Sequence, residues 1–384
     1  MPDACKCGCP RCEGVVVSDP EYAFPVRAGS DELRYLPCEL HCHSQHSDGH
    51  WTVSELLRAG AGEGLSLLAL TDHNTFSGIA ELTPALQAET IPAIPGIEWT
   101  TDYGHLLVLA AARDVDWRTA NLRNIDEKLA EIRSAGGLCG IAHPFRPGDP
   151  ICCGCTFEFE VGRFDLVDFI EVWSGPFPPA RSECRRALAW WSGLLDRGYH
   201  IAATHGRDWH GRSPGAGGAL QACTYLGFSN GIPTVAGALD ALRGGRTVVS
   251  LGPLATFVLE RDADGAVARI GDRVDWSGVR APALSCTVTV SGGWPKPEGG
   301  SGHGADMPSG GESDMRAESV AILGRGGRVV WESALEKDAG TGVPASAAGR
   351  FSTDSPYLRL ELRGTCAGTL RTLALSSPVW IGKP

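Results

Sequence analysis

Short apolar runs of strand length alternate with stretches of helical period along the first two thirds of the chain. The apolar runs lie at residues 65–70, 91–100, 105–111, 138–143, 164–172, 200–204, 224–228 and 247–251. Helical patterns lie at 52–59, 78–87, 117–135, 179–197 and 235–242, and the pattern at 117–135 is the longest. Strands that alternate with helices are typical of a mainly parallel α/β fold.

Local signals mark the ends of several of these elements. Thr52 with Glu55 three residues later forms a capping box, which predicts the start of a helix. Gly136 and Gly137 predict the end of the helix at 117–135. Residues 101–104 are turn-like and predict a hairpin between two strands. This hairpin would bring Glu98 close to His105.

After residue 252 the pattern changes to short alternating strands, at 255–259, 267–270, 283–290, 320–322, 328–331 and 357–362. They predict a small β-sandwich. Residues 292–316 are rich in Gly, Ser and Pro and predict a flexible loop. We therefore expect three parts: a Cys-rich tail and lead-in at 1–35, an α/β domain at 36–252 and the β-sandwich at 253–384.

Histidine and carboxylate residues follow the apolar runs, at the ends of predicted strands. His41 and His43 are one residue apart on an extended segment, so their side chains point the same way. Because loops that follow the strands of a parallel barrel converge on one face, residues far apart in sequence can meet there around a metal cluster. The candidate ligands are His41, His43, Asp48, His73, Glu98, His105, His143, Asp208 and His210.

The motifs that carry these residues resemble the motif series of the PHP (polymerase and histidinol phosphatase) superfamily, over residues 36–252. They are His41-x-His43 with Ser47-Asp48-Gly49, Thr71-Asp72-His73-Asn74-Thr75, Gly96-Ile97-Glu98, Ala142-His143-Pro144 and Asp208-x-His210. The closing segment at 374–381 resembles the tail of the CehA/McbA-type branch. The resemblance implies a PHP-type distorted (β/α)7 barrel and places each of the nine candidates at a metal-binding position.

Nine ligands are too many for one ion and suit two or three divalent ions with open positions. Mixed imidazole and carboxylate ligands do not choose between Zn, Mn and Fe. Glu98 is the best candidate for a bridging carboxylate. Paired ions lower the pKa of a bridging water, so that hydroxide exists near neutral pH, and they hold the oxygens of the scissile group.

Three functions are compatible with this set of ligands. The first is a metal-dependent phosphoesterase, either a phosphomonoesterase or a phosphodiesterase, acting on a small molecule or a nucleotide. The second is a carbamate or carboxylic ester hydrolase of the CehA/McbA type; arginines facing the metals would favour phosphate, and an apolar wall would favour the ester. The third is a non-catalytic metal-binding scaffold. Degenerate PHP domains typically lose ligands, so retention of all nine argues for an enzyme.

Four polar residues close to the ligand motifs are candidates for supporting roles. Asp72 precedes His73 and would orient that imidazole, the alternative being a turn-capping aspartate. Arg146 and Arg207 could each clamp a phosphate or carboxylate with two hydrogen bonds, the alternative being a surface arginine. We expect His205 to contact the substrate or to have a structural role.

Cysteine usage and charge give the remaining expectations. Residues Cys5, Cys7, Cys9 and Cys12 could share an additional structural zinc ion with Cys152, Cys153 and Cys155, the alternative being an unliganded tail.

Without a visible signal segment or a bilayer-spanning run, we expect a cytoplasmic protein with no membrane partner. The net charge of -11 argues against a surface that wraps nucleic acid, but it allows a small anionic substrate at metal ions. The oligomeric state is open at this point.

Overall fold

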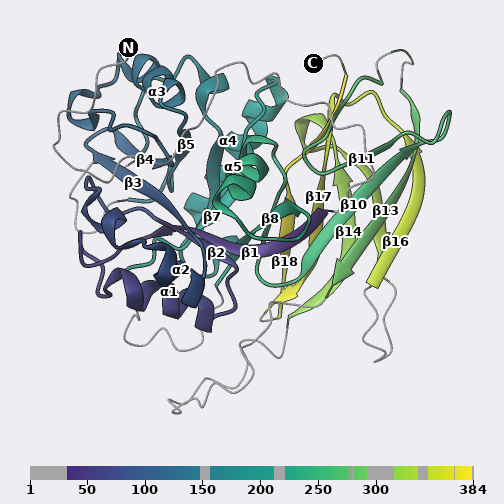
Figure 1. The fold of residues 1–384 in the computed structure, drawn as a ribbon. Coiled ribbons are helices and arrows are strands. Elements are labelled where there is room, and N and C mark those ends of the chain that lie inside the picture. The colour runs from purple at the N-terminus through teal and green to yellow at the C-terminus, as the bar shows by residue number, and fades with distance from the viewer. Residues whose placement is uncertain are drawn as a thin grey trace.

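A computed structural model describes residues 33–147, 156–211, 221–276, 278, 281–291, 315–335, 345–366 and 368–382. Both proposed cysteine clusters, most of the lead-in at 1–35 and nearly all of the predicted loop at 292–316 lie outside these residues. The fold is a mixed α/β arrangement in which the helices gather in one half and strands fill the other (Figure 1).

The first two thirds of the chain contribute nine strands to one continuous sheet. They are β1 (Leu33–Cys42), β2 (Leu67–Leu70), β3 (Ala93–Thr101), β4 (Gly104–Leu109), β5 (Leu138–Ile141), β6 (Phe169–Ser174), β7 (Ala202–Gly206), β8 (Cys223–Ser229) and β9 (Thr247–Ser250). The β1–β2–β3 and β5–β6–β7 sets are parallel, while β3–β4–β5 is antiparallel. The predicted hairpin at residues 101–104 is confirmed as the β3–β4 connection.

Five described helices accompany this sheet; three of them begin at a side-chain N-cap, and four contain buried residues. The five helices are α1 (Val53–Gly62), α2 (Pro84–Glu89), α3 (Ile125–Ser134), α4 (Ser182–Asp196) and α5 (Val235–Arg243), with 3-10 turns η1 (Ser77–Glu81), η2 (Trp117–Thr119), η3 (Phe164–Leu166), η4 (Pro178–Ala180) and η5 (Arg325–Gly327). The capping box of α1 is confirmed, because Thr52 accepts from the Glu55 amide and the Glu55 carboxylate accepts from the Thr52 amide. Its buried residues Val53, Leu56 and Leu57 pack in one cluster with β2.

Two predicted helices are shorter than their sequence patterns. The pattern at 78–87 is interrupted: η1 ends before Thr83, which caps a new helix with Pro84 in its first turn, where proline is tolerated. The pattern at 117–135 becomes helical only at Ile125. Asn121 and Asn124 accept hydrogen bonds from each other's backbone amides, and this local turn competes with the helix. Helix α4 is therefore the longest described helix, and α3 ends at Ser134, just before the predicted Gly136, which has a positive φ.

The closed barrel expected from the sequence is not found among the described residues. In a closed barrel, β7 would pair with the free edge of β1. Here β8 pairs antiparallel with that edge along residues 33–38, and β9 pairs with β8 in turn. Among the described strands, β7 forms a main-chain ladder with β6 alone, although it lies against β1, β8 and β9.

The last third of the described chain consists of strands. They are β10 (Leu254–Arg261), β11 (Val267–Arg269), β12 (Arg273–Val274), β13 (Ala283–Ser291), β14 (Arg316–Leu323), β15 (Val329–Ala334), β16 (Ala345–Ser352), β17 (Tyr357–Cys366), β18 (Thr369–Ser376) and β19 (Val379–Ile381). The order β11-β10-β13-β16 forms a separate sheet, whereas β18 pairs with β9 and so joins the long sheet. Inward residues of both sheets, such as Phe257, Val288 and Leu360, belong to one hydrophobic cluster. The β-sandwich and the boundary at residue 252 stay predictions.

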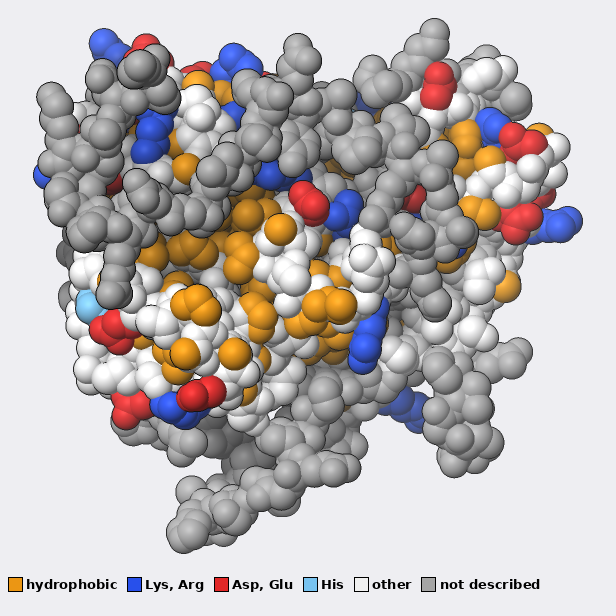
Figure 2. Space-filling view, in the orientation of Figure 1, with side chains coloured by type: hydrophobic (Ala, Val, Ile, Leu, Met, Phe, Trp, Pro, Cys, Tyr) orange, Lys and Arg blue, Asp and Glu red, His pale blue; other side chains and the backbone are white. Residues whose placement is uncertain are grey.

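Three general features of the described residues bear on the sequence expectations. Seven cysteines are free and buried. No helix here has both the length and the apolar character needed to cross a membrane. Acidic and basic side chains are interspersed on the face that Figure 2 shows, with no continuous basic surface among the residues coloured there.

The capping box of α1 gives a test of the fold. Replacing Thr52 with Ala leaves the Glu55 amide without its acceptor, and we expect the free energy of unfolding to fall by about 1 kcal/mol. Urea unfolding of the full chain, followed by far-UV circular dichroism, measures this loss. Thr52→Ser keeps the hydroxyl and should retain most of the stability; an equal loss in both variants would contradict the capping argument.

Candidate metal centre

The nine side chains proposed as ligands are brought together at the ends of the strands. His41 lies in β1 and His43 just after it; Glu98 and His105 lie in the β3–β4 hairpin; the others follow β1, β2, β5 and β7. Every one of the nine belongs to a group of residues whose ligand atoms lie within 4.8 Å of one another. The sequence motifs, although scattered along 170 residues of chain, therefore converge as expected.

Three of these groups share members and form a continuous cluster. A buried group consists of His41, His43, Glu98 and Asp208. A second group shares Glu98 and adds His105 and His143. A third group shares His43 and adds Asp48, His73 and His210, whose side chains are partly or largely exposed. The cluster thus runs from the protein interior to the surface.

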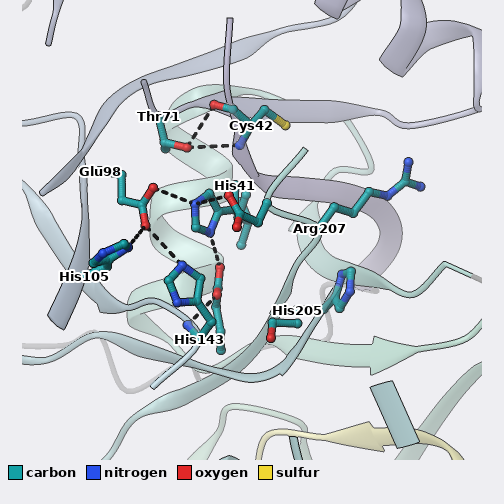
Figure 3. Close-up of polar contacts among 12 residues, drawn as sticks. His41, Cys42, Thr71, Glu98, His105, His143, His205 and Arg207 are labelled. Atoms are coloured by element: carbon teal, nitrogen blue, oxygen red, sulfur yellow. Dashed lines mark hydrogen bonds and ion pairs between the residues drawn. The ribbon is translucent and has the colours of Figure 1, made fainter. Parts of the chain in front are cut away.

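Glu98 lies at the centre of the cluster, and its two oxygens face different partners (Figure 3). Oε2 lies 3.1 Å from His41 Nε2, 3.3 Å from His43 Nε2 and 2.9 Å from His73 Nδ1. Oε1 lies 2.8 Å from His105 Nδ1 and 3.2 Å from His143 Nε2. The backbone bridge between His73 and Glu98 and the β3–β4 pairing hold this residue in place.

Several atoms at the centre are buried without a hydrogen-bond partner among the described residues. They are His41 Nε2, His43 Nε2, Glu98 Oε2 and Asp208 Oδ1. Asp208 Oδ1 lies only 3.0 Å from His43 Nε2 and 3.3 Å from His41 Nε2. Unpaired buried polar atoms are costly, and imidazole nitrogen with carboxylate oxygen is a donor set that divalent metal ions bind. The cluster therefore fits divalent metal ions, and its chemistry does not select one metal.

The electrostatics of the cluster also favour positive charge. Burial would raise the pKa of Glu98, but attraction to His41 and hydrogen bonds from His105 and His143 hold that pKa well below its usual range. Burial likewise opposes the ionised form of Asp208, and the two neighbouring imidazoles outweigh it to lower the pKa. Burial would lower the pKa of His43, yet the nearby carboxylates of Asp208 and Glu98 raise it to about 9. Two ionised carboxylates thus lie inside the protein and attract cations or protons.

Glu171 is a member of the site that the sequence reasoning missed. Its Oε1 lies 2.8 Å from His41 Nδ1, and its Oε2 accepts a hydrogen bond of 2.7 Å from the His143 amide. Gly206 makes room for this carboxylate, because a Cβ there would lie 1.8 Å from Glu171 Oε1. The available signal was a single acid in the mostly apolar strand β6.

A second buried carboxylate, Glu39, lies behind His41. Its Oε1 accepts hydrogen bonds from the amides of Leu40, His41 and Arg207 at 3.0, 3.1 and 3.0 Å. Burial raises the pKa of Glu39 to about 7 against the attraction of Arg207. Glu39 precedes His41 by two residues on the same strand face, and this spacing was the signal that could have pointed to it.

The two candidate arginines lie in different places. Arg146 Nη1 lies 2.8 Å from Asp208 Oδ2 and the side chain is 34% exposed, so Arg146 faces the cluster and solvent together. The Arg207 side chain is directed away from Glu98 and His41 (Figure 3). It is buried between Glu39 and Glu63, with its guanidinium over the Trp209 ring. Because neighbouring side chains alternate in direction, Arg207 and Asp208 do not reach the same side, and the predicted role of Arg207 as an anion clamp is not supported.

The side chains of His205 and Asp72 form hydrogen bonds with parts of the protein outside the metal cluster. His205 is fully buried in β7, its Nε2 lies 3.3 Å from the Gly175 carbonyl oxygen, and burial lowers its pKa to about 4. Asp72 does not orient His73: its carboxylate accepts from Ser44 N, Ser44 Oγ and Ser47 Oγ at 2.7–2.9 Å. Asp72 thus caps the loop that carries Asp48. Its side chain projects from the strand end in the direction opposite to that of His73, because neighbouring side chains alternate.

Cys42 lies between His41 and His43 in sequence and points to the other face of the strand. It is buried in the cluster of α1 and β2 with Leu56 and Leu68, and burial raises the pKa of its thiol well above the usual value. At this end of β1 the pairing with β2 shifts register, and the Thr71 hydroxyl accepts from the Cys42 amide and donates to its carbonyl. The metal cluster therefore contains no thiol from β1.

Parts of the chain are similar to known proteins. The model of the PHP domain matches residues 39–118. The chain is 36% identical over 115 residues to the 3',5'-nucleoside bisphosphate phosphatase of Chromobacterium violaceum, covering 28% of this chain and 40% of that protein. It is 40% identical over 65 residues to the 5'-3' exoribonuclease of Haemophilus influenzae, covering 17% of this chain and 24% of that protein. The matched stretches thus span less than half the length of these two relatives.

A similar solved structure is a two-domain protein from Bacteroides vulgatus containing a predicted PHP-like metal-dependent phosphoesterase. It is 14% identical, with a TM-score of 0.46, and the match covers 90% of this chain and 96% of that chain. The CehA/McbA-type branch is not confirmed by these comparisons. The match to the domain model covers residues 39–118, which hold the motifs at 41–49, 71–75 and 96–98 in the expected order, so this part of the chain is similar to the PHP domain.

Proposed function

We propose that the protein is a metal-dependent hydrolase of phosphate esters that acts on a small molecule or a nucleotide. The observation that carries the proposal is the set of buried, unpartnered nitrogen and oxygen atoms that converge beside Glu98, with one arginine at their edge. The names of the two relatives support the chemistry, since one is a bisphosphate phosphatase and the other an exoribonuclease.

The proposal assigns the nine ligands to two or three divalent ions of Zn, Mn or Fe. Glu98 would contribute to both inner sites, because its oxygens face separate groups of imidazoles. The buried group and the group with His105 and His143 would form the inner sites, and the group with Asp48, His73 and His210 the outer one. Divalent ions, when bound, supply hydroxide near neutral pH and neutralise the charge that develops on a phosphate ester.

The protein's own side chains orient the ligands and the substrate. Glu171 would accept a hydrogen bond from the Nδ1–H of His41, and this tautomer leaves Nε2 as the ligand atom; carboxylates in this position tighten metal binding. Arg146 is placed to bind an anionic ester beside Asp208, with charge-assisted hydrogen bonds. This arginine favours the phosphate ester over the carbamate or carboxylic ester, although the second arginine expected for that argument, Arg207, is turned away.

The ligand assignment predicts a joint loss of metal and activity. In His43→Ala and Asp208→Ala we expect at least 100-fold lower turnover of aryl phosphate esters, because each removes a ligand atom from the buried group. Metal content by plasma mass spectrometry should fall in parallel. His50→Ala, which removes an exposed imidazole of the same loop, is the control and should behave as wild type. Normal turnover by chelator-treated protein would refute the proposal.

The placement of Arg146 predicts which substrate the site prefers. Arg146→Ala should raise the KM for p-nitrophenyl phosphate about 10-fold or more, because a charge-assisted hydrogen bond to the ester is lost. Arg146→Lys should recover part of this. The hydrolysis of a neutral aryl carbamate, assayed in parallel with added Mn, Zn or Fe, should not change. A faster carbamate reaction that also depends on Arg146 would favour the CehA/McbA-type alternative, and no hydrolysis in any assay would favour the scaffold.

The contact between Glu171 and His41 predicts a role in metal affinity. Glu171→Gln keeps the shape of the side chain but removes its charge, and we expect divalent-metal affinity to fall about 10-fold. Titration of metal-free protein with Mn²⁺, followed calorimetrically, measures this. Glu183→Gln, which changes a carboxylate paired with Arg181, is the control. Equal affinities of the two variants would show that Glu171 does not orient the ligand.

A further inference from the structure

Strand β7 has a main-chain ladder on one side and a column of side-chain oxygens on the other. The amides of Ala203, His205 and Arg207 alternate along this second side. They donate to Ser377 Oγ at 2.9 Å, to Thr224 Oγ1 at 2.8 Å and to Glu39 Oε1 at 3.0 Å. The three acceptors come from the β18–β19 connection, from β8 and from β1.

The carbonyl groups on the same side are satisfied in the same way. Thr247 Oγ1 donates to the Ala203 carbonyl at 2.7 Å and lies 2.7 Å from Ser377 Oγ. Thr224 Oγ1 donates to the His205 carbonyl at 3.2 Å. All of these side chains are buried. We refer to Glu39, Thr224, Thr247 and Ser377 together as the side-chain ladder.

The side-chain ladder replaces the strand that would otherwise pair with this edge of β7. A hydroxyl both donates and accepts, so one Ser or Thr can satisfy an amide and a carbonyl that a neighbouring backbone would satisfy in a regular sheet. The three amides are two residues apart, which is the interval at which successive backbone groups point to the same edge of a strand. Without these oxygens three buried amides would lack acceptors, and such groups are costly.

The ladder ends at the residues that carry the metal cluster. Just beyond Arg207, the chain enters a left-handed turn at Asp208 (φ 56°), and Trp209 exchanges backbone hydrogen bonds with the end of β1. The Trp209 amide donates to the His41 carbonyl at 3.0 Å, and the His43 amide donates to the Trp209 carbonyl at 2.9 Å. The position of the end of β7 relative to β1 therefore decides where the Asp208 carboxylate meets the two imidazoles.

We propose that Ser377 and Thr247 are positioning residues of the metal centre, which act through β7 to hold Asp208 against His41 and His43. This gives the closing motif at 374–381 a role: its serine reaches 174 residues back along the chain to the strand that carries a ligand. The naming of these atoms as metal ligands rests on the proposed function. The ladder itself rests on the hydrogen bonds.

Two adjacent serines provide the test in the full-length protein. Ser376 is also fully buried, but its hydroxyl accepts from the Leu360 amide inside the C-terminal strands and, among the described residues, makes no hydrogen bond to β7. Ser376→Ala and Ser377→Ala each remove one buried hydroxyl, so both should lower the melting temperature. Only Ser377→Ala should weaken Mn²⁺ binding by the metal-free protein, by roughly 10-fold as for other residues that support metal ligands. Equal Mn²⁺ affinity in the two variants would overturn the positioning role.

A second pair of variants separates loss of the hydroxyl from loss of packing. Thr247→Val keeps the volume of the side chain and should weaken Mn²⁺ binding, whereas Thr247→Ser keeps the hydroxyl and should restore it. Amide hydrogen exchange followed by NMR gives a readout that needs no metal: the Ala203 amide should exchange faster in Ser377→Ala and stay protected in Ser376→Ala. Equal exchange in both would overturn the ladder. A wild-type protein that binds no Mn²⁺ would count against the proposed function, and the exchange measurement would still decide the ladder.

Discussion

Two ionised carboxylates buried among imidazoles are the constraint on which the rest of this structure depends. Glu98 and Asp208 lie inside the protein with oxygens that have no hydrogen-bond partner among the described residues, and only a positive charge can compensate them. The strand ends that supply the imidazoles come from both parallel sets of the sheet. The hairpin β3–β4 adds His105 beside Glu98, so even the antiparallel interruption of the sheet serves the same cluster.

Holding these charges in place requires rigid strands, and the hydrogen bonds that fix these strands are of more than one kind. Behind β1 and β7, backbone groups are satisfied by side chains as well as by other strands, as with Thr71 at Cys42 and Glu39 at Arg207. The parallel sets present ligands at one edge, and β8 and β9 lead the chain from that edge into the C-terminal strands. The C-terminal part is thus continuous with the sheet that carries the ligands, which explains why a residue near the end of the chain can contact β7.

Much of the ligand set could be predicted from the sequence, because each motif follows an apolar run and the ends of strands are local features. The capping box at Thr52 and the hairpin at 101–104 are local as well, and both were confirmed. The direction of a side chain after a strand depends on tertiary packing, so Asp72 and Arg207 were assigned contacts that they do not make. Glu171 was missed because nothing adjacent in sequence marks its partner His41, 130 residues away. The closed barrel was expected wrongly, because the sequence of neither β1 nor β8 alone reveals that these two strands pair.

The orientation of Cys42 has a consequence for the selection of ions. Its sulfur lies on the far side of β1 in an apolar cluster, where burial keeps the thiol protonated. A cation that enters between His41 and His43 therefore meets nitrogen and oxygen donors only, although a soft donor lies between them in sequence. Thiophilic ions such as Cu⁺ or Cd²⁺ gain no sulfur anchor from this strand, and the discrimination against them is built into the alternation of a single β-strand.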